Sequence, residues 1–79
     1  MDFQVGQNVR LVSLPNWLAQ LPEESREVFR ACLGGTFPVE EIEADGVLVL
    51  NVSRVAVPLF GGHRHVIMVD PANVAPIEQ

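Results

Sequence analysis

The sequence predicts a mainly β fold of five strands, with one α-helix inserted between the first strand and the second, in a single domain over residues 1–79. Three observations support this prediction. Apolar residues alternate with polar ones on both sides of a segment in which they instead recur every three or four residues. Two dipeptides typical of tight hairpin turns, Asp45-Gly46 and Gly61-Gly62, divide the second half of the chain. A turn signal from Asp70 to Asn73 then precedes a short apolar segment.

The first strand is expected within Val5–Leu14. Val9 and Leu11 fall on one side of this strand and Arg10 on the other, which is the alternation of a half-buried strand. Pro15 ends the strand because proline has no N–H to donate to a neighbouring strand.

Residues 22–33 carry the period of an α-helix. Pro22 suits the first helical position, and acidic residues follow it where they face the positive end of the helix dipole. Gly34 and Gly35 supply a stop. The apolar stripe of the helix consists of Val28, Phe29, Cys32 and Leu33. Two ion pairs are expected on its solvent face, Glu23 with Arg26 and Glu27 with Arg30.

The β pattern returns at Thr36. An extra residue before Ile42 predicts a bulge in this second strand, and the Asp45-Gly46 turn leads into the third. Val47–Val52 is a nearly continuous run of β-branched residues and leucine, which is typical of a strand with little solvent on either face. We expect this strand to continue through residues 55–57 to Pro58.

The last part of the chain predicts two more strands. The Gly61-Gly62 turn leads into a strand over His63–Val69. Asp70–Ile77 fits one turn of 3₁₀-helix followed by a very short final strand.

The composition excludes several classes of protein. The apolar content of 48% is too high for a disordered chain, and no apolar run is long enough to cross a bilayer. Acidic Asp2 stands where a secretory signal would carry basic residues, and a single cysteine, Cys32, cannot form a disulfide framework, so we expect a cytoplasmic protein. The net charge of −5, with no lysine, disfavours binding to nucleic acid.

The order of these elements resembles that of a Src-homology-3-like barrel, in which a Pro-x-Asn turn precedes the last strand. The resemblance therefore implies a five-stranded SH3-like barrel. Over nearly the whole chain the pattern is also similar to a group of small, uncharacterised bacterial proteins with this fold. The residues that carry this likeness are Gly6, Val9, Arg10, Leu11, Leu21, Pro22, Glu23, Glu24, Gly35, Phe37, Val39, Asp45, Gly46, His65, Ile67, Val69, Asp70 and Pro71.

The chain departs from the peptide-binding members of this class. Those proteins grip polyproline ligands with a row of tyrosines and a tryptophan, whereas this chain contains no tyrosine. The position after Asn73, which is tyrosine in the peptide-binding type, is Val74. We therefore do not expect binding of a polyproline peptide.

An apolar hairpin tip is the leading candidate for a functional surface. Leu59 and Phe60 run into the Gly61-Gly62 turn, where polar residues are expected, and Trp17 lies in a predicted short turn over residues 15–19 that covers one end of the sheet. The leading hypothesis is thus a non-catalytic protein-interaction or accessory module whose partner is a second copy or a larger complex. Covering of the tip by the protein's own helix is the competing interpretation.

His63 and His65 support a second hypothesis, a module that binds a metal or a small ligand. Two histidines separated by one residue on a strand project to the same side and can both reach one ion. A third ligand would have to come from Cys32, Asp70 or Glu41, and no spacing in the sequence places one nearby. Two ligands do not complete a zinc site, so we favour a structural role for both histidines and expect no cofactor.

No residue is a good candidate for catalysis, and we expect that the protein is not an enzyme. Cys32 belongs to the apolar stripe of the helix and is expected to be an inert core residue. A third hypothesis is a barrel associated with nucleic acid through Arg10, Arg54 and Arg64, and it requires these arginines to gather on one face. The acidic residues Glu40, Glu41, Glu43 and Asp45 are interpreted as a solvated strand edge and turn.

Overall fold

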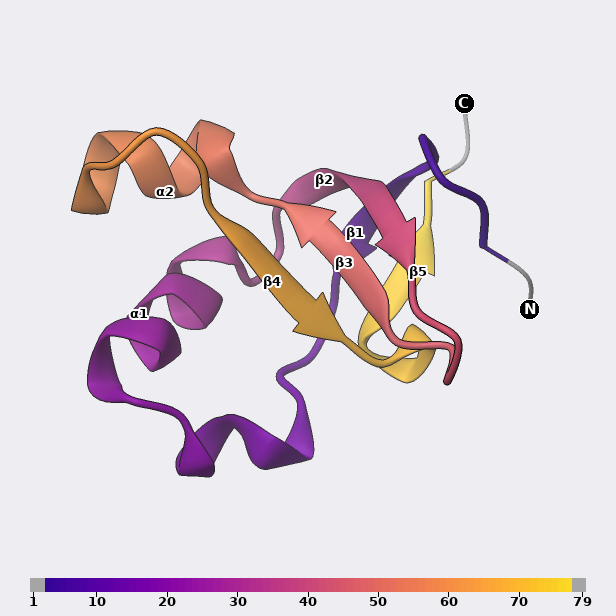
Figure 1. The fold of residues 1–79 in the computed structure, drawn as a ribbon, viewed down its shortest axis with the longest axis horizontal. Helices are drawn as coiled ribbons and strands as arrows, with labels where there is room; N and C mark the ends of the chain where they lie inside the picture. The colour runs from indigo at the N-terminus through magenta and orange to yellow at the C-terminus, as the bar shows by residue number, and fades with distance from the viewer. Residues whose placement is uncertain (1–2, 78–79) are drawn as a thin grey trace.

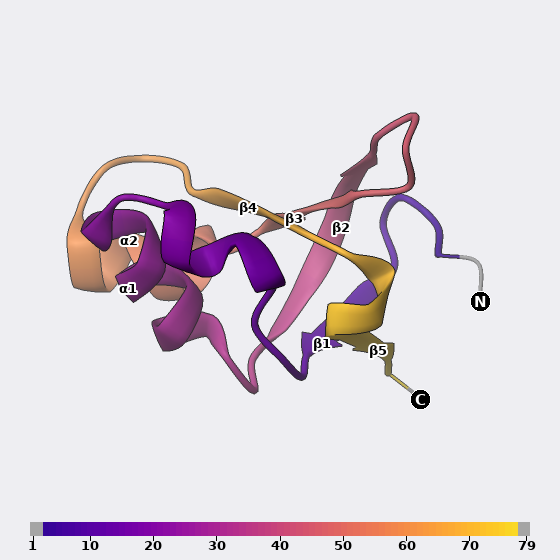
Figure 2. The same ribbon diagram turned by 90° about the horizontal axis from the view of Figure 1, so that it is seen from below.

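A computed structural model describes residues 3–77 and shows an antiparallel sheet of five strands with two α-helices gathered at one end of it (Figures 1 and 2). None of the helices formed by these residues has the length and apolar character needed to cross a membrane. Asp2, on which the expected lack of a secretory signal rests, lies outside the described residues. In chain order the elements are β1 (Asn8–Leu11), the 3₁₀-helix η1 (Asn16–Gln20), α1 (Glu23–Cys32), β2 (Thr36–Ile42), β3 (Leu48–Asn51), α2 (Ser53–Phe60), β4 (Val66–Val69), the 3₁₀-helix η2 (Pro71–Asn73) and β5 (Val74–Pro76).

The sheet has the strand order β4-β3-β2-β1-β5, so the first and last strands of the chain are neighbours. β2 is the longest strand, and it pairs with β1 through Phe37 and Pro38 and with β3 through Val39 and Ile42. The register shifts between Val39 and Glu41, which confirms the bulge predicted before Ile42. β4 and β5 are the two edges of the sheet, and the sheet is not closed into a barrel.

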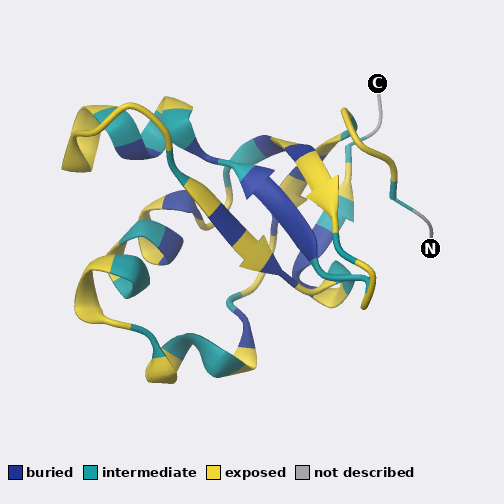
Figure 3. Cartoon of the chain, viewed as in Figure 1, coloured by how far each residue is buried: buried dark blue, intermediate teal, exposed yellow. Residues whose placement is uncertain are grey.

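The core is formed by side chains of the sheet together with side chains of α1 and Ala56 of α2. Figure 3 shows β3 buried along most of its length, as the run of apolar residues predicted. The largest fully buried side chain is Phe37, and Phe29 and Cys32 of α1 pack into the same cluster. The central apolar run is therefore covered by the protein itself, and only part of the predicted apolar surface remains exposed.

The helix α1 agrees with the prediction to within one residue at each end. Pro22 precedes its first residue, and Gly34, with φ of +85°, follows the exposed Leu33 that ends it. A glycine is favoured at Gly34 because other residues are strained at positive φ. Leu33 belongs to the predicted apolar stripe but is 48% exposed, since it lies at the C-cap rather than on the buried face.

The second helix corrects the predicted fold, because residues 53–60 form α2 and do not continue the third strand. The Asn51 side chain accepts a hydrogen bond from the Ser53 N–H (3.0 Å), and the Ser53 hydroxyl accepts one from the His65 N–H (2.9 Å). These two hydrogen bonds stabilise the change of chain direction after β3 and connect the start of α2 with the segment before β4. Ala56 is fully buried, and α2 contacts α1. Packing has overridden the β propensity of this valine-rich segment.

The strands β1 and β4 are shorter than predicted. β1 ends at Leu11 rather than Leu14, because the N–H groups of Val12 and Ser13 both donate to the carbonyl of Asn73 (2.8 and 3.2 Å). β4 begins at Val66 rather than His63, so Gly61 and Gly62 belong to a loop between a helix and a strand and not to a hairpin turn.

The Asn73 side chain connects the segment after β1 with the start of η2. Its side-chain oxygen accepts a hydrogen bond from the Asp70 N–H (3.0 Å), and its side-chain nitrogen donates to the Ser13 hydroxyl (3.0 Å), 60 residues away. Asn73 is a buried polar residue, and a buried polar group has to find hydrogen-bond partners. The predicted 3₁₀ turn and short final strand are confirmed as η2 and β5.

Candidate interaction site

A groove of about 440 Å³ lies where α1, the end of α2 and the loop before β4 come together. The sequence brings these elements together because the apolar side of α2, which includes Ala56, packs toward α1. The groove is lined by Glu24, Ser25, Glu27, Val28, Phe60 and His65. Its apolar lining comes from Val28 and Phe60, and the carboxylates of Glu24 and Glu27 form an acidic rim. The groove is open to solvent.

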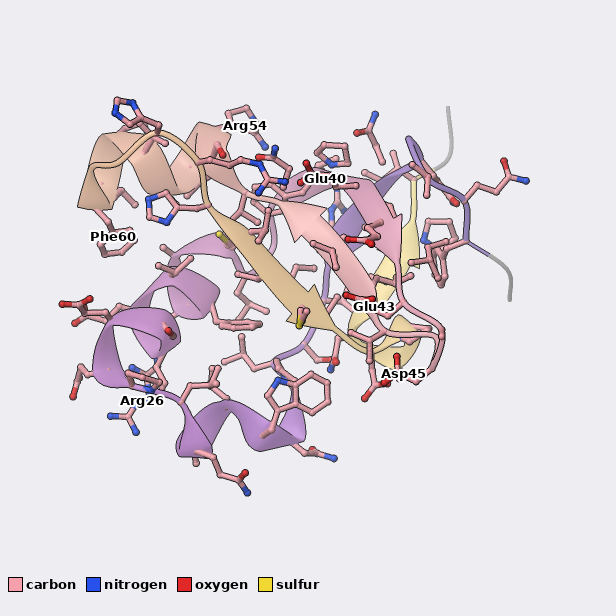
Figure 4. The ribbon with its side chains drawn as sticks, in the orientation of Figure 1. Arg26, Glu40, Glu43, Asp45, Arg54 and Phe60 are labelled. Carbon is pink, nitrogen blue, oxygen red and sulfur yellow. The ribbon has the colours of Figure 1, made fainter. Side chains whose placement is uncertain are left out.

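Two neighbouring apolar side chains stand at the end of α2 beside this groove. Phe60 is 43% exposed, and Figure 4 shows its ring on the side of α2 that faces α1. Leu59 is 62% exposed and lies next to it in the chain. Gly61, with φ of +82°, ends the helix directly after Phe60. The predicted apolar tip is thus the end of a helix, and it is only partly covered, with Leu59 more exposed than Phe60.

His65 closes one wall of the groove and is held by the loop. Its Nε2 lies 2.6 Å from the carbonyl oxygen of Gly61, which fixes the ring across the turn. His63 is exposed, and both histidines lie in the loop before β4 rather than on a strand, so the alternation expected to align them does not apply. Among residues 3–77, no three side chains of histidine, cysteine, aspartate or glutamate come together as metal ligands.

The carboxylates of Glu24 and Glu27 form the acidic rim. The predicted pair of Glu23 with Arg26 is confirmed at 3.2 Å, and Figure 4 shows Arg26 on the side of α1 away from α2. The predicted pair of Glu27 with Arg30 is wrong, because no ion pair joins these two residues. In the described part of the chain, neither rim carboxylate has a salt-bridge partner.

Trp17 does not line this groove. It is half-buried in η1, and Figure 1 places that segment on the far side of α1 from α2. Leu18, its neighbour, packs against the core, as the sequence predicted for this short turn. The three candidate interface residues therefore separate into Leu59 and Phe60 at the groove and Trp17 elsewhere.

Cys32 lies fully buried in the core. Burial raises the pKa of its thiol from 9.0 to about 11, against a smaller opposing effect of the Arg54 charge. The prediction of a buried core cysteine is confirmed, and the thiol remains protonated at neutral pH.

The three arginines weighed for nucleic-acid binding serve different contacts. Arg54 donates to the carbonyl of Thr36 (2.7 Å) and lies over the Phe37 ring, 5.4 Å from its centre. Arg64 forms an ion pair with Glu40, and the hydrogen bond that the guanidinium donates to this carboxylate raises the pKa of Arg64. Arg10 lies exposed on β1. Two of the three are thus engaged within the protein.

The acidic edge forms part of a second, shallower hollow at the hairpin between β2 and β3. Figure 4 shows Glu43 and Asp45 at this end of the molecule, away from the helices. The Asp45 carboxylate accepts a hydrogen bond from the Val47 N–H (3.2 Å), which stabilises the turn. This contact agrees with the interpretation of Asp45 as a turn residue.

The sequence predicted some of the residues that line the groove and not the others. Leu59, Phe60 and His65 were predicted candidates, whereas Glu24, Glu27 and Val28 were assigned only to the helix. The spacing of Glu24, Glu27 and Val28 places them on one helix face, but the sequence carries no signal that this face meets the end of α2. In comparisons with family models, curated proteins and solved structures, no match to this chain was found.

Proposed function

We propose that this chain is a non-catalytic protein-interaction module of the cytoplasm, and that it docks onto a partner through Leu59, Phe60 and the groove between α1 and α2. The partner is a second copy of the chain or a component of a larger complex. No chemistry is assigned to the groove.

The observation that carries this proposal is the exposure of two adjacent large apolar side chains, Leu59 and Phe60, at the end of a helix and beside a groove. An apolar patch rimmed by polar groups is typical of a surface that binds another protein. A buried aromatic anchor usually supplies much of the affinity of such an interface, and Phe60 is placed to act in that way.

We further propose that the open sheet is a variant of the SH3-like barrel, akin to the small bacterial proteins that the sequence resembles. Support comes from β1, which pairs with both β2 and β5, and from the 3₁₀ turn ending in Asn73 directly before β5. The bulge between Val39 and Glu41 lets β2 bend between its two partners, as barrel closure would require. A polyproline ligand remains unexpected, because Val74 is not an aromatic residue.

Replacing Phe60 by aspartate tests the interaction surface. We expect Phe60→Asp to abolish concentration-dependent association in sedimentation between about 10 µM and 1 mM, or to abolish capture of a specific partner from the native host, since a buried charge is costly at an interface. The unfolding midpoint is measured as well, because Phe60 is only 43% exposed and the variant has to be shown to fold.

Val5→Asp is the matched control, since Val5 is 64% exposed and lies in the turn before β1. It should leave association and capture unchanged. A strictly monomeric wild type whose captured proteins are the same as those of Phe60→Asp would remove the proposed function.

A further inference from the structure

Within residues 3–77 the acidic rim of the groove has no basic partner, and this feature goes beyond what an apolar docking surface needs. Glu24 and Glu27 are three residues apart on α1, so the two negative charges lie on one face and repel each other. Arg26 pairs with Glu23, and Arg30 forms no ion pair with Glu27. A cation supplied from outside would relieve this repulsion.

The apolar and aromatic side chains that line the groove favour one kind of cation over the others. Val28 is half-buried and provides an apolar floor, and the partly exposed ring of Phe60 provides a flat wall. An arginine side chain matches both surfaces, because its aliphatic stem packs on apolar groups and its planar guanidinium stacks on aromatic rings. The guanidinium has five N–H donors and can reach two carboxylates at once, which a lysine ammonium does less well.

We propose that the groove between α1 and α2 binds an arginine side chain presented by an exposed basic segment of a partner protein. The inference rests on the proposed function and adds the chemistry of the partner. The guanidinium lies between Glu24 and Glu27 and stacks on Phe60, and an apolar residue beside the arginine packs on Leu59. The net charge of −5 also favours approach of a basic segment.

Nuclear magnetic resonance titration of the whole chain tests this inference with two peptides. The probe is acetyl-Gly-Leu-Arg-Gly-amide, and its counterpart carries citrulline, which has nearly the shape of arginine but no charge. We expect the arginine peptide to shift the resonances of Glu24, Glu27, Val28 and Phe60. We expect the citrulline peptide to bind at least about tenfold more weakly.

A pair of double variants separates the groove from the overall charge. Glu24→Gln with Glu27→Gln should weaken binding of the arginine peptide by about tenfold or more. Glu41→Gln with Glu43→Gln makes the same change in net charge on a different part of the surface and should stay within about twofold of the wild type. Glutamine is a good helix former, so the variants at positions 24 and 27 are expected to fold.

Any one of four results would overturn the inference. Equal affinity for the two peptides would show that the groove does not recognise the guanidinium charge, and equal weakening by the two double variants would show that only net charge acts. Absence of shifts at about 5 mM peptide would exclude arginine as the occupant. The first result would leave the proposed protein interaction standing, because that proposal depends on the separate Phe60→Asp measurement. Without peptide, the resonances of the same residues could instead shift as the protein concentration rises. If this self-association also displaces the arginine peptide, the groove is assigned to a second copy of the chain.

Discussion

At the scale of single residues, Cys32 is unusual because of what the rest of the chain lacks. The sequence contains no tyrosine, and all five of its basic residues besides the histidines are arginines. Cys32 is therefore the one side chain that titrates between the range of histidine and that of arginine. Its thiol is fully buried, and burial raises its pKa from 9.0 to about 11.

This isolation gives a pH dependence that can be assigned to one atom. In the unfolded chain the Cys32 thiol ionises near its ordinary pKa of 9.0, whereas in the folded protein it stays protonated until about pH 11. The folded state therefore holds its full stability below pH 9 and loses stability as the pH rises toward 11. We expect the free energy of unfolding to fall by about 1–2 kcal/mol between pH 8 and pH 10.5, measured with urea.

Cys32→Ala is the control for this prediction. The smaller side chain lowers stability at both pH values because it leaves a cavity. It should nevertheless remove most of the decline between them. An equal decline in the variant would show that another group, or a general expansion of the chain, causes the pH dependence.

At the scale of elements, the turn from α1 into β2 depends on two glycines for different reasons. Gly34 has a positive φ of +85° and open space around it. Gly35 has an ordinary φ, but a Cβ there would lie 2.8 Å from Cζ of Phe37 and 3.1 Å from the carbonyl oxygen of Cys32. Phe37 is fully buried and lies under Arg54, so its ring has little room to move away.

A double-mutant cycle with Phe37 distinguishes these two reasons. Gly35→Ala is expected to cost about 1–3 kcal/mol by overpacking, and Gly34→Ala about 1–2 kcal/mol by backbone strain. Phe37→Leu removes the ring atoms that the new methyl group meets, so it should recover about 1 kcal/mol of the Gly35→Ala cost. It should leave the Gly34→Ala cost unchanged within about 0.5 kcal/mol, as measured by urea unfolding. Strict additivity in both cycles would contradict the close approach at Gly35.

The elements also show where sequence patterns determine structure and where packing does. The helix at residues 23–32, the bulge in β2 and the 3₁₀ turn before β5 follow from local signals, such as the glycines after the helix and the Pro71-x-Asn73 turn. Residues 55–58 were predicted as the end of the third strand because valine is common in strands. Their helical signals were the Asn51 side chain, which accepts a hydrogen bond from the Ser53 N–H, and the spacing of Val52, Ala56 and Leu59. Pro58 obscured these signals.

Pro58 lies inside α2 near its end, where its missing N–H removes one hydrogen bond from the helix and its ring disturbs the preceding turn. The compensating contacts are tertiary, since the fully buried Ala56 packs in the core. A contact between segments that are far apart in the chain has no signature in a local pattern. For the same reason, Leu59 and Phe60 could be proposed from the sequence but their acidic neighbours on α1 could not.

At the scale of the whole molecule, the distribution of charge argues against nucleic acid as a ligand. Arg54 and Arg64 are held by Thr36 and Glu40, and the net charge is −5. Of the three arginines weighed for this role only Arg10 is left, and one arginine does not form the basic surface that neutralises several phosphates.

We expect no binding to a duplex of about 20 base pairs at about 50 mM salt, measured by fluorescence anisotropy with protein up to about 50 µM. Binding at this salt that weakens as salt is added, and that is lost in Arg10→Gln, would contradict the prediction. Arg30→Gln, which changes an exposed arginine on α1, is the matched control.

The hydrogen bonds of Asn73 to Ser13 and Asp70 have a consequence for how the chain is made. β1 receives β5 as its second neighbour only after residues 74–76 have emerged from the ribosome, and Ala75 of β5 is 65 residues after its partner Arg10 in β1. At about 5–20 residues per second, the free edge of β1 stays available to other chains for several seconds during each round of synthesis. An unpaired strand edge is a starting point for aggregation, and a net charge of −5 opposes association of such chains by mutual repulsion.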